Sequence, residues 1–244
     1  MNRIFRSLDV LLGLGLTASL AMCLLTALPT SASAADAATE QRAVVGFVGL
    51  DVAGSFDVRV RQASRDSVEV RAEADLLPLI ETVIEGDKVL HVRWKRFSSV
   101  RTSSHPIIDI GVVQLQSLLS SGSSKVKVEG MKSPRLSIQV SGAGDVSLND
   151  LSTEQLTLGI SGSGDVKATG QAERLQIKIS GSGDVRTEGL KADEVSVSIA
   201  GSGDAAVRAE KTLKVAIAGS GDVSYTGAAT VKSSIAGSGR VHKR

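Results

Sequence analysis

A short glycine-rich motif returns at nearly constant intervals through the second half of this sequence. The motif Gly-x-Gly-Asp occurs five times, and a sixth copy carries Arg240 in place of the aspartate. The first glycines of these copies, which lie 18 to 20 residues apart, are Gly142, Gly162, Gly181, Gly201, Gly219 and Gly237. A weaker copy, Ser121-Gly122-Ser123-Ser124, precedes them. A short fixed period of this kind is typical of repeat proteins whose units stack on their neighbours.

Each repeat contains a strand-like segment in which apolar and polar residues alternate before the glycine turn. Leu175, Ile177 and Ile179 form one such triplet, and the equivalent triplets are Leu136/Ile138/Val140, Leu156/Leu158/Ile160, Val195/Val197/Ile199 and Leu213/Val215/Ile217. A period of two indicates a half-buried strand and not a helix. A unit of about 19 residues cannot bury its own apolar row, whereas stacked units bury each other's rows. The sequence therefore predicts an all-β parallel β-solenoid with one GSGD turn per coil.

The turn residues have two expected roles. We expect glycines such as Gly183 and Gly203 to supply the positive φ that a sharp reversal requires. The aspartates after them, one per coil, are expected to accept a backbone N–H within their own turn. A cation ladder that binds Ca²⁺ is the alternative, although the calcium β-roll has a nine-residue repeat that this spacing does not match. Arg240 is expected to cap the aspartate row over Asp222.

The first 34 residues have the features of an export signal. Arg3 and Arg6 precede an apolar run that ends at Pro29, and Ala32-Ser33-Ala34 offers a cleavage site. An uncleaved membrane anchor and a lipoprotein modified at Cys23 are the alternatives. Cys23 is the only cysteine, so a mature chain without residues 1–34 has no disulfide and no cysteine-based metal site.

The remaining chain divides into three expected parts. Residues 44–120 contain alternating segments such as Phe56/Val58/Val60 and are expected to form a less regular opening stretch that caps the N-terminal end of the solenoid. Gly86-Asp87 predicts a hairpin or coil turn, and residues 98–105 predict a loop. Residues 121–228 form the regular repeats, and residues 229–244 form a terminal repeat with a basic cap.

Three groups of residues resemble one bacterial family. They are Val45-Gly46-Phe47-Val48-Gly49-Leu50-Asp51-Val52, Phe56-Asp57-Val58-Arg59-Val60 and the Ser-Gly-Ser-Gly-Asp-Val turns from residue 161 onward. Over residues 44–228 the chain resembles the family named putative auto-transporter adhesin, head GIN domain. The resemblance implies a right-handed parallel β-helix, a cell-surface or periplasmic location, a role in adhesion and no assigned catalytic residues. The chain departs from the pattern at Gly122-Ser123-Ser124-Lys125, which puts the first coil in question.

No constellation of catalytic or metal-binding residues stands out in the sequence. His91, His105 and His242 are scattered and lack the spacing of a zinc site or a triad, so we interpret His91 and His242 as plain surface residues. The Gly-Ser-Gly turn recurs in every coil and is followed by a strand, which excludes a phosphate loop. Carbohydrate-active enzymes generally present aromatic platforms, and Trp94 and Tyr225 are the only Trp and Tyr. We therefore predict no catalytic, cofactor or metal site.

One basic segment, Arg93-Trp94-Lys95-Arg96-Phe97, departs from the mixed charge of the rest of the chain. It could meet an anionic partner such as lipopolysaccharide or a membrane. The favoured interpretation is a strand end whose Trp94 packs under the cap while the cations stay solvated.

Three hypotheses for function follow. The first is a non-catalytic exported envelope protein, a scaffold for adhesion or interaction in the periplasm, at the outer membrane or on the cell surface. The second is a structural solenoid that assembles end to end as a homo-oligomer, and the third is a carbohydrate-active β-helix enzyme. We expect an envelope or cell-surface partner, and the formal net charge of +2, spread over both signs, gives no indication of nucleic-acid binding.

Overall fold

The computed structural model describes residues 37–96 and 105–244, and these residues form an all-β fold with a single 3₁₀ turn, Leu77–Leu79. The strands before the regular repeats are β1 (Ala37–Arg42), β2 (Gly49–Gly54), β3 (Asp57–Gln62), β4 (Ser67–Glu73), β5 (Ile80–Glu85), β6 (Val89–Trp94), β7 (Ile107–Val112), β8 (Ser117–Gly122) and β9 (Lys125–Glu129). The remaining strands are β10 (Lys132–Gly142), β11 (Asp145–Gly162), β12 (Val166–Gly181), β13 (Val185–Gly201), β14 (Ala205–Gly219), β15 (Val223–Thr226), β16 (Thr230–Gly237) and β17 (Val241–Lys243). The model therefore confirms the predicted all-β class.

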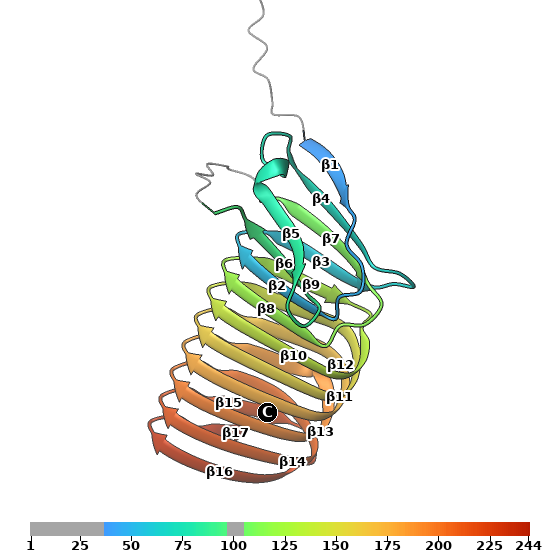
Figure 1. Ribbon diagram of the computed structural model, residues 1–244. Helices are drawn as coiled ribbons and strands as arrows, with labels where there is room; N and C mark the ends of the chain where they lie inside the picture. Colours follow the sequence, from blue (N-terminus) through green and yellow to red (C-terminus); the bar gives the residue numbers. More distant parts are fainter. Residues whose placement is uncertain (1–36, 97–104) are drawn as a thin grey trace, which may run out of the picture. The chain divides into compact units, whose positions relative to one another are not determined.

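Successive repeats stack in parallel and in register, as the alternating triplets predict (Figure 1). Ile177 pairs with Leu158 on one side and with Val197 on the other, and Gly181 pairs in the same way with Gly162 and Gly201. Equivalent residues of neighbouring coils therefore lie side by side, about 4.8 Å apart as in any sheet. This arrangement confirms the β-solenoid.

Two parallel ladders run through the stack, one on each side of the glycine corner. The first ladder holds the segments before the corner and contains β6, β2, β8, the later parts of β10 to β14, and β16. The second ladder holds the segments after the corner and contains β7, β3, β9, the earlier parts of β11 to β14, then β15 and β17. Each coil contributes one strand to each ladder.

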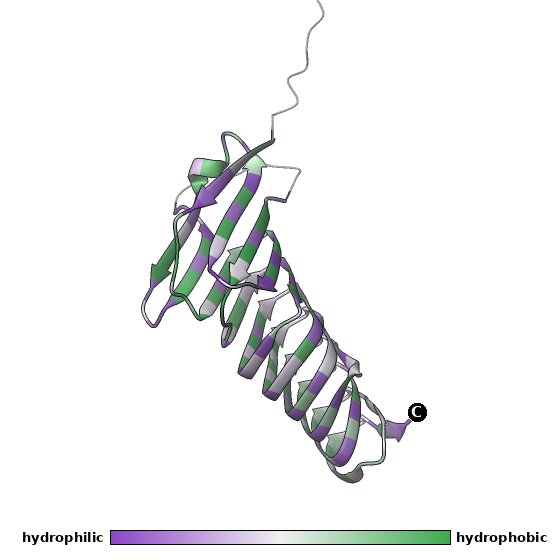
Figure 2. Ribbon diagram, turned by 90° about the vertical axis from the view of Figure 1, so that its right-hand side faces the viewer, coloured by the Kyte–Doolittle hydropathy of each residue, from purple (hydrophilic) through white to green (hydrophobic). Residues whose placement is uncertain are grey.

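The core of the fold lies between the ladders and consists almost entirely of aliphatic side chains. Leu156, Ile177 and Val197 are at most 2% exposed, as are most residues of the predicted triplets. Polar and apolar residues alternate along the strands, which gives the banded ribbon in Figure 2. Since burial of one such side chain contributes about 1.5–3 kcal/mol, the stacked aliphatic rows are the main source of stability.

The two glycines of each corner are required for different reasons. The first glycine has positive φ, for example +130° at Gly181 and +137° at Gly201, so the expected conformational role is correct for this position. Gly183 and Gly203 do not share that conformation, and the expectation is wrong for them. A Cβ on Gly203 would instead overlap the carbonyl oxygen of Gly183 in the preceding coil. The second glycine therefore permits close approach between coils.

The aspartate row joins neighbouring coils and does not close single turns. The N–H of Asp204 donates to Oδ1 of Asp184 at 3.2 Å, and the N–H of Asp222 donates to Oδ1 of Asp204 at 2.7 Å. The expectation of a bond within the same turn is therefore wrong. Arg240 ends the row as predicted, because its N–H donates to Asp222 at 2.8 Å and its guanidinium lies 4.0 Å from the same carboxylate.

The order of coils in space differs from their order in the chain at the N-terminal end. β2 pairs with both β6 and β8, and β3 pairs with both β7 and β9. The earliest coil of the sequence, residues 49–62, is thus sandwiched between two coils that follow it. Gln62, at the end of β3, links this coil to two later segments of the chain. Its side-chain amide donates hydrogen bonds to the carbonyl oxygens of Val113, after β7, and Lys132, in β10.

Antiparallel strands complete this end of the stack. β5 and β6 form a hairpin, so the hairpin interpretation of Gly86-Asp87 is correct. β4 pairs antiparallel with β7, and β1 pairs antiparallel with β4. At the same end of the stack, Phe56 and Trp94 stack with ring centroids 5.1 Å apart.

Two predictions fall on segments that the model leaves undescribed. The export signal, including Cys23 and the cleavage site, lies outside the described residues, as does most of the predicted loop at 98–105. Within residues 37–96 and 105–244, no helix is long and apolar enough to cross a membrane.

Candidate functional site

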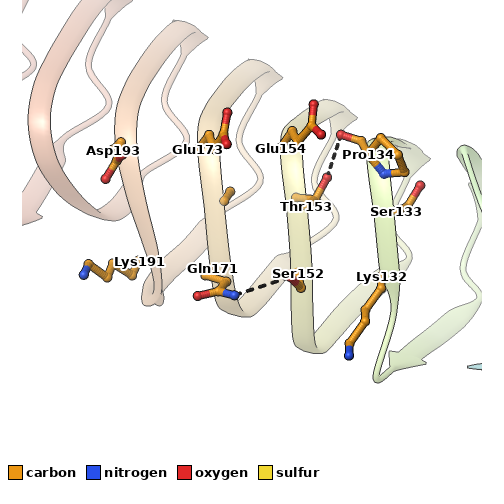
Figure 3. Close-up of a pocket in the computed structure, with 11 residues that line it drawn as sticks. Lys132, Ser133, Pro134, Ser152, Thr153, Glu154, Gln171, Glu173, Lys191 and Asp193 are labelled. Carbon is orange, nitrogen blue, oxygen red and sulfur yellow. Dashed lines mark hydrogen bonds between the residues drawn. The ribbon is translucent and has the colours of Figure 1, made fainter.

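A hollow on the described surface lies at a second bend of the coils, away from the glycine corners. At this bend two consecutive residues face outward, as Pro134 and Arg135 do, and the strand then turns into the first ladder. The hollow is a groove of about 550 Å³ that crosses four successive coils, from Lys132 to Lys191 (Figure 3). We call it the bend groove.

Small side chains form the floor of the bend groove. Ser133, Thr153 and Ala172 occupy equivalent positions in three successive coils, and each is at most 9% exposed. The hydroxyl of Ser133 donates to the carbonyl oxygen of Arg135 at 2.8 Å, and that of Thr153 donates to the carbonyl oxygens of Pro134 and Gln155 at 3.2 and 3.1 Å. These bonds satisfy the hydroxyls inside the protein, so the floor is closed and the flanking side chains define the walls.

The two walls carry different chemistry. One wall is a row of polar and basic side chains, one per coil, and consists of Lys132, Ser152, Gln171 and Lys191. The other wall carries the carboxylates of Glu154, Glu173 and Asp193 in successive coils. Figure 3 shows the two rows on either side of the floor. A ligand in the bend groove would meet cationic and amide groups on one side and carboxylates on the other.

Few interactions inside the protein use these wall residues. Gln171 donates from Nε2 to the hydroxyl of Ser152 at 3.4 Å. Asp193 binds the ammonium of Lys211 at 2.8 Å, and this hydrogen bond raises the pKa of the Lys211 ammonium. Glu173 forms a long ion pair of 3.8 Å with Arg174. An external partner could therefore replace the water bound to these side chains, and few hydrogen bonds within the protein would be lost.

The geometry supports binding of an extended polar partner along the solenoid axis. Because equivalent side chains repeat once per coil, the bend groove offers hydrogen-bonding groups about 4.8 Å apart. In the described part of the chain, no group of three His, Cys, Asp or Glu side chains is arranged to hold a metal ion. The arrangement offers recognition by hydrogen bonds and charge, which is the chemistry of a binding surface.

The histidines remain dispersed in the fold. His91 is not a plain surface residue, because it is partly buried on β6 and its Nδ1 lies 2.9 Å from Oδ2 of Asp51 on β2. His105 and His242 are exposed, before β7 and on β17 respectively. The structure brings none of the three near the bend groove.

One cation of the basic segment at the end of β6 forms ion pairs within the fold. Arg93 binds Glu81 at 3.0 Å and Glu85 at 2.7 Å, and its side chain remains 36% exposed, so its charge is paired but stays at the surface. These hydrogen bonds raise the pKa of Arg93 and lower that of Glu85. Trp94 stacks on Phe56 and packs against the core, as predicted, whereas Phe97 lies outside the described residues. The ion pairs leave less charge available for an anionic partner.

The bend groove was not predicted from the sequence. Its signal is the column of small residues three positions before the first apolar residue of four successive triplets, such as Ser133 before Leu136 and Ala172 before Leu175. A small residue at the same place in successive repeats marks a shallow point on the surface between longer neighbours. Only the register of the coils shows that these points join into one groove.

The family model described as "Putative auto-transporter adhesin, head GIN domain" matches residues 46–229 of this chain. The match spans most of the described residues and confirms the resemblance that the repeats and the opening strands carry. No curated protein matches the chain significantly.

Several solved structures share this fold. A putative adhesin from Bacteroides fragilis superposes with a TM-score of 0.82 at 24% identity, covering 86% of this chain and 97% of that one. A putative adhesin from Parabacteroides merdae gives a TM-score of 0.68 at 23% identity and covers 85% and 96%. A putative lipid binding protein from Parabacteroides distasonis gives 0.70 at 22% identity and covers 86% and 97%. These likenesses concern the fold.

Proposed function

Because the chain belongs to the putative auto-transporter adhesin, head GIN domain family, we propose that it is a non-catalytic, exported envelope protein that acts as an adhesion or interaction scaffold. In this proposal the solenoid is a rigid support, and its outward side chains meet a partner in the periplasm, at the outer membrane or on the cell surface. The family supports an adhesion-like role, and the apolar N-terminal segment of the sequence supports export.

The bend groove is the observation that carries this proposal. It presents one polar or basic side chain from each of four coils and a carboxylate from each of three, and such periodic presentation suits an extended envelope polymer better than a compact small molecule. We therefore assign the contact with the partner to the bend groove.

A binding experiment with one blocking variant and one matched control tests this proposal. Gln171 and Lys178 both lie exposed on β12, but only Gln171 lines the bend groove. We expect Gln171→Trp to reduce binding of the labelled protein to isolated envelopes of the producing organism at least tenfold, since the indole fills the groove. Lys178→Trp should bind like the unmodified protein.

Two outcomes would contradict the assignment. Equal loss of binding in both variants would show that the groove has no special part in it. Release of reducing ends from envelope polysaccharide by the unmodified protein would show that the chain is an enzyme and would replace the scaffold proposal.

A further inference from the structure

The last coil of the solenoid leaves both of its strand edges unpaired. Among the described residues, β16 pairs only with β14 and β17 only with β15. Ser233 takes the place that Val215 occupies one coil earlier, and Ile235 is 41% exposed although its equivalent Ile217 is buried. Unpaired backbone groups beside a half-covered apolar row form a template for a further strand.

This end of the molecule carries charge of one sign. Residues 223–244 contain no Asp or Glu, and their basic residues are Lys232, Arg240, Lys243 and Arg244. Two copies joined at their C-terminal ends would therefore repel each other. A partner strand that carries carboxylates would meet this edge with attraction and not with repulsion.

The opposite end of the same chain has the complementary properties. Among the described residues, β1 pairs only with β4, and β5 only with β6, so each leaves one edge open. These two strands carry Glu40, Glu81 and Glu85 against a single Arg42, and Ile84 on β5 is 37% exposed. Each end thus presents open strand edges and an exposed isoleucine. The edge strands β1 and β5 carry a net negative charge, and Arg93 of β6 pairs with Glu81 and Glu85.

The direction of β1 permits the second ladder to continue from one copy into the next. β1 is antiparallel to β4, and β4 is antiparallel to β7, so β1 runs in the direction of the parallel coils. A groove of about 540 Å³ opens beside β1 and β5, and its charged lining residues are Glu40, Glu81, Arg42 and Lys95. Glu40 pairs with Arg42 at 3.1 Å and Glu81 with Arg93 at 3.0 Å, so basic side chains of β17 would share these carboxylates with the chain's own cations.

We propose that the chain binds a second copy of itself head to tail, with β17 of one copy added to β1 of the next. This contact is independent of the bend groove and goes beyond the scaffold role, because it sets how many scaffolds a single assembly presents. The two surfaces are different, so the contact is heterologous and each new copy offers a fresh open end. Assembly is therefore open-ended.

Cysteine cross-linking of the full chain tests the contact directly. In a Cys23→Ser background, Thr39→Cys marks β1 and His242→Cys marks β17, and both positions are exposed. Copper–phenanthroline oxidises two neighbouring thiols to a disulfide when their Cα atoms lie within about 7 Å. We expect a dimer when the two single variants are mixed, a ladder of multimers from the double variant, and no cross-link from either single variant alone.

A control and a second measurement make the result decisive. Ser198→Cys, exposed on the face of β13, should not cross-link with His242→Cys. Sedimentation of the full chain in detergent should show mass that rises with protein concentration and falls with added salt, and Glu40→Lys should shift it toward the monomer. A cross-link from His242→Cys alone would overturn the head-to-tail arrangement. A monomer at every concentration would overturn self-association.

Discussion

The hydroxyl of Ser124 donates a hydrogen bond of 3.0 Å to the carbonyl oxygen of Gly54, across 70 residues of sequence. The hydroxyl oxygen of Ser124 in turn accepts a hydrogen bond of 3.1 Å from the N–H of Phe56. Ser124 is fully buried at the corner position where later coils have a glycine. Ser124 thus links the corner at Gly122 to the corner between β2 and β3, which lies much earlier in the chain.

Ser124→Ala removes both of these bonds and leaves the N–H of Phe56 buried without a partner. We expect the free energy of unfolding to fall by about 1–3 kcal/mol, which is the usual cost of such a group. Urea denaturation followed by circular dichroism measures the change. Ser123→Ala, one residue away and exposed, is the control and should change stability little. Equal stability of both variants would mean that the bond contributes nothing.

The corner glycines should be far less replaceable than glycines in open turns. Ala at Gly203 would overlap the backbone of the preceding coil, and Ala at Gly201 would add an unfavourable φ of +137° to the same overlap. We expect each variant to lose more than about 3 kcal/mol or to fail to fold. Gly86→Ala, at positive φ but with open space around it, should lose only about 1–2 kcal/mol. Thermal melting of the three variants ranks them, and a small loss at Gly203 would contradict the close-approach argument.

Ser120 offers a route to a more stable protein. It points into the core between Val52 and Val140, is 1% exposed, and its Oγ has no hydrogen-bond partner. Since a buried unpaired hydroxyl is costly, Ser120→Ala should raise the free energy of unfolding by about 1 kcal/mol. The neighbouring Ser121, which is not fully buried, provides the control variant Ser121→Ala. A lower melting temperature for Ser120→Ala would show that the hydroxyl does find a partner.

Two substitutions of Asp204, in the aspartate row, distinguish the contribution of its hydrogen bond to stability from that of its charge. Asp204→Asn keeps an acceptor for the N–H of Asp222 and removes one of several like charges stacked in neighbouring coils. We expect its stability at low ionic strength to equal or exceed that of the unmodified protein, whereas Asp204→Ala should lose about 1 kcal/mol. Chemical denaturation at two salt concentrations distinguishes the two contributions. A loss in Asp204→Asn that equals the loss in Asp204→Ala would show that the charge itself is needed.

The difference between prediction and structure is clearest around Gly54. Gly54-Ser55-Phe56-Asp57 occupies a corner equivalent to the later GSGD turns, and β2 and β3 flank it as ladder strands. The motif escaped detection because Phe56 stands where the repeats have glycine. Phe56 stacks there on Trp94, with ring centroids 5.1 Å apart. The weak turn at Gly122, in contrast, forms a regular corner, with φ of +105°.

The aliphatic triplets and their constant period were sufficient to predict the stacked coils from the sequence. Each triplet is repeated at the same place, so one register buries all of them and any other register exposes apolar rows. The tertiary structure alone decided that residues 49–62 lie between two later coils, that antiparallel strands complete the N-terminal end, and that separate small residues join into the bend groove. These features depend on pairing between segments far apart in the chain, and local alternation contains no information about which distant strand becomes the neighbour.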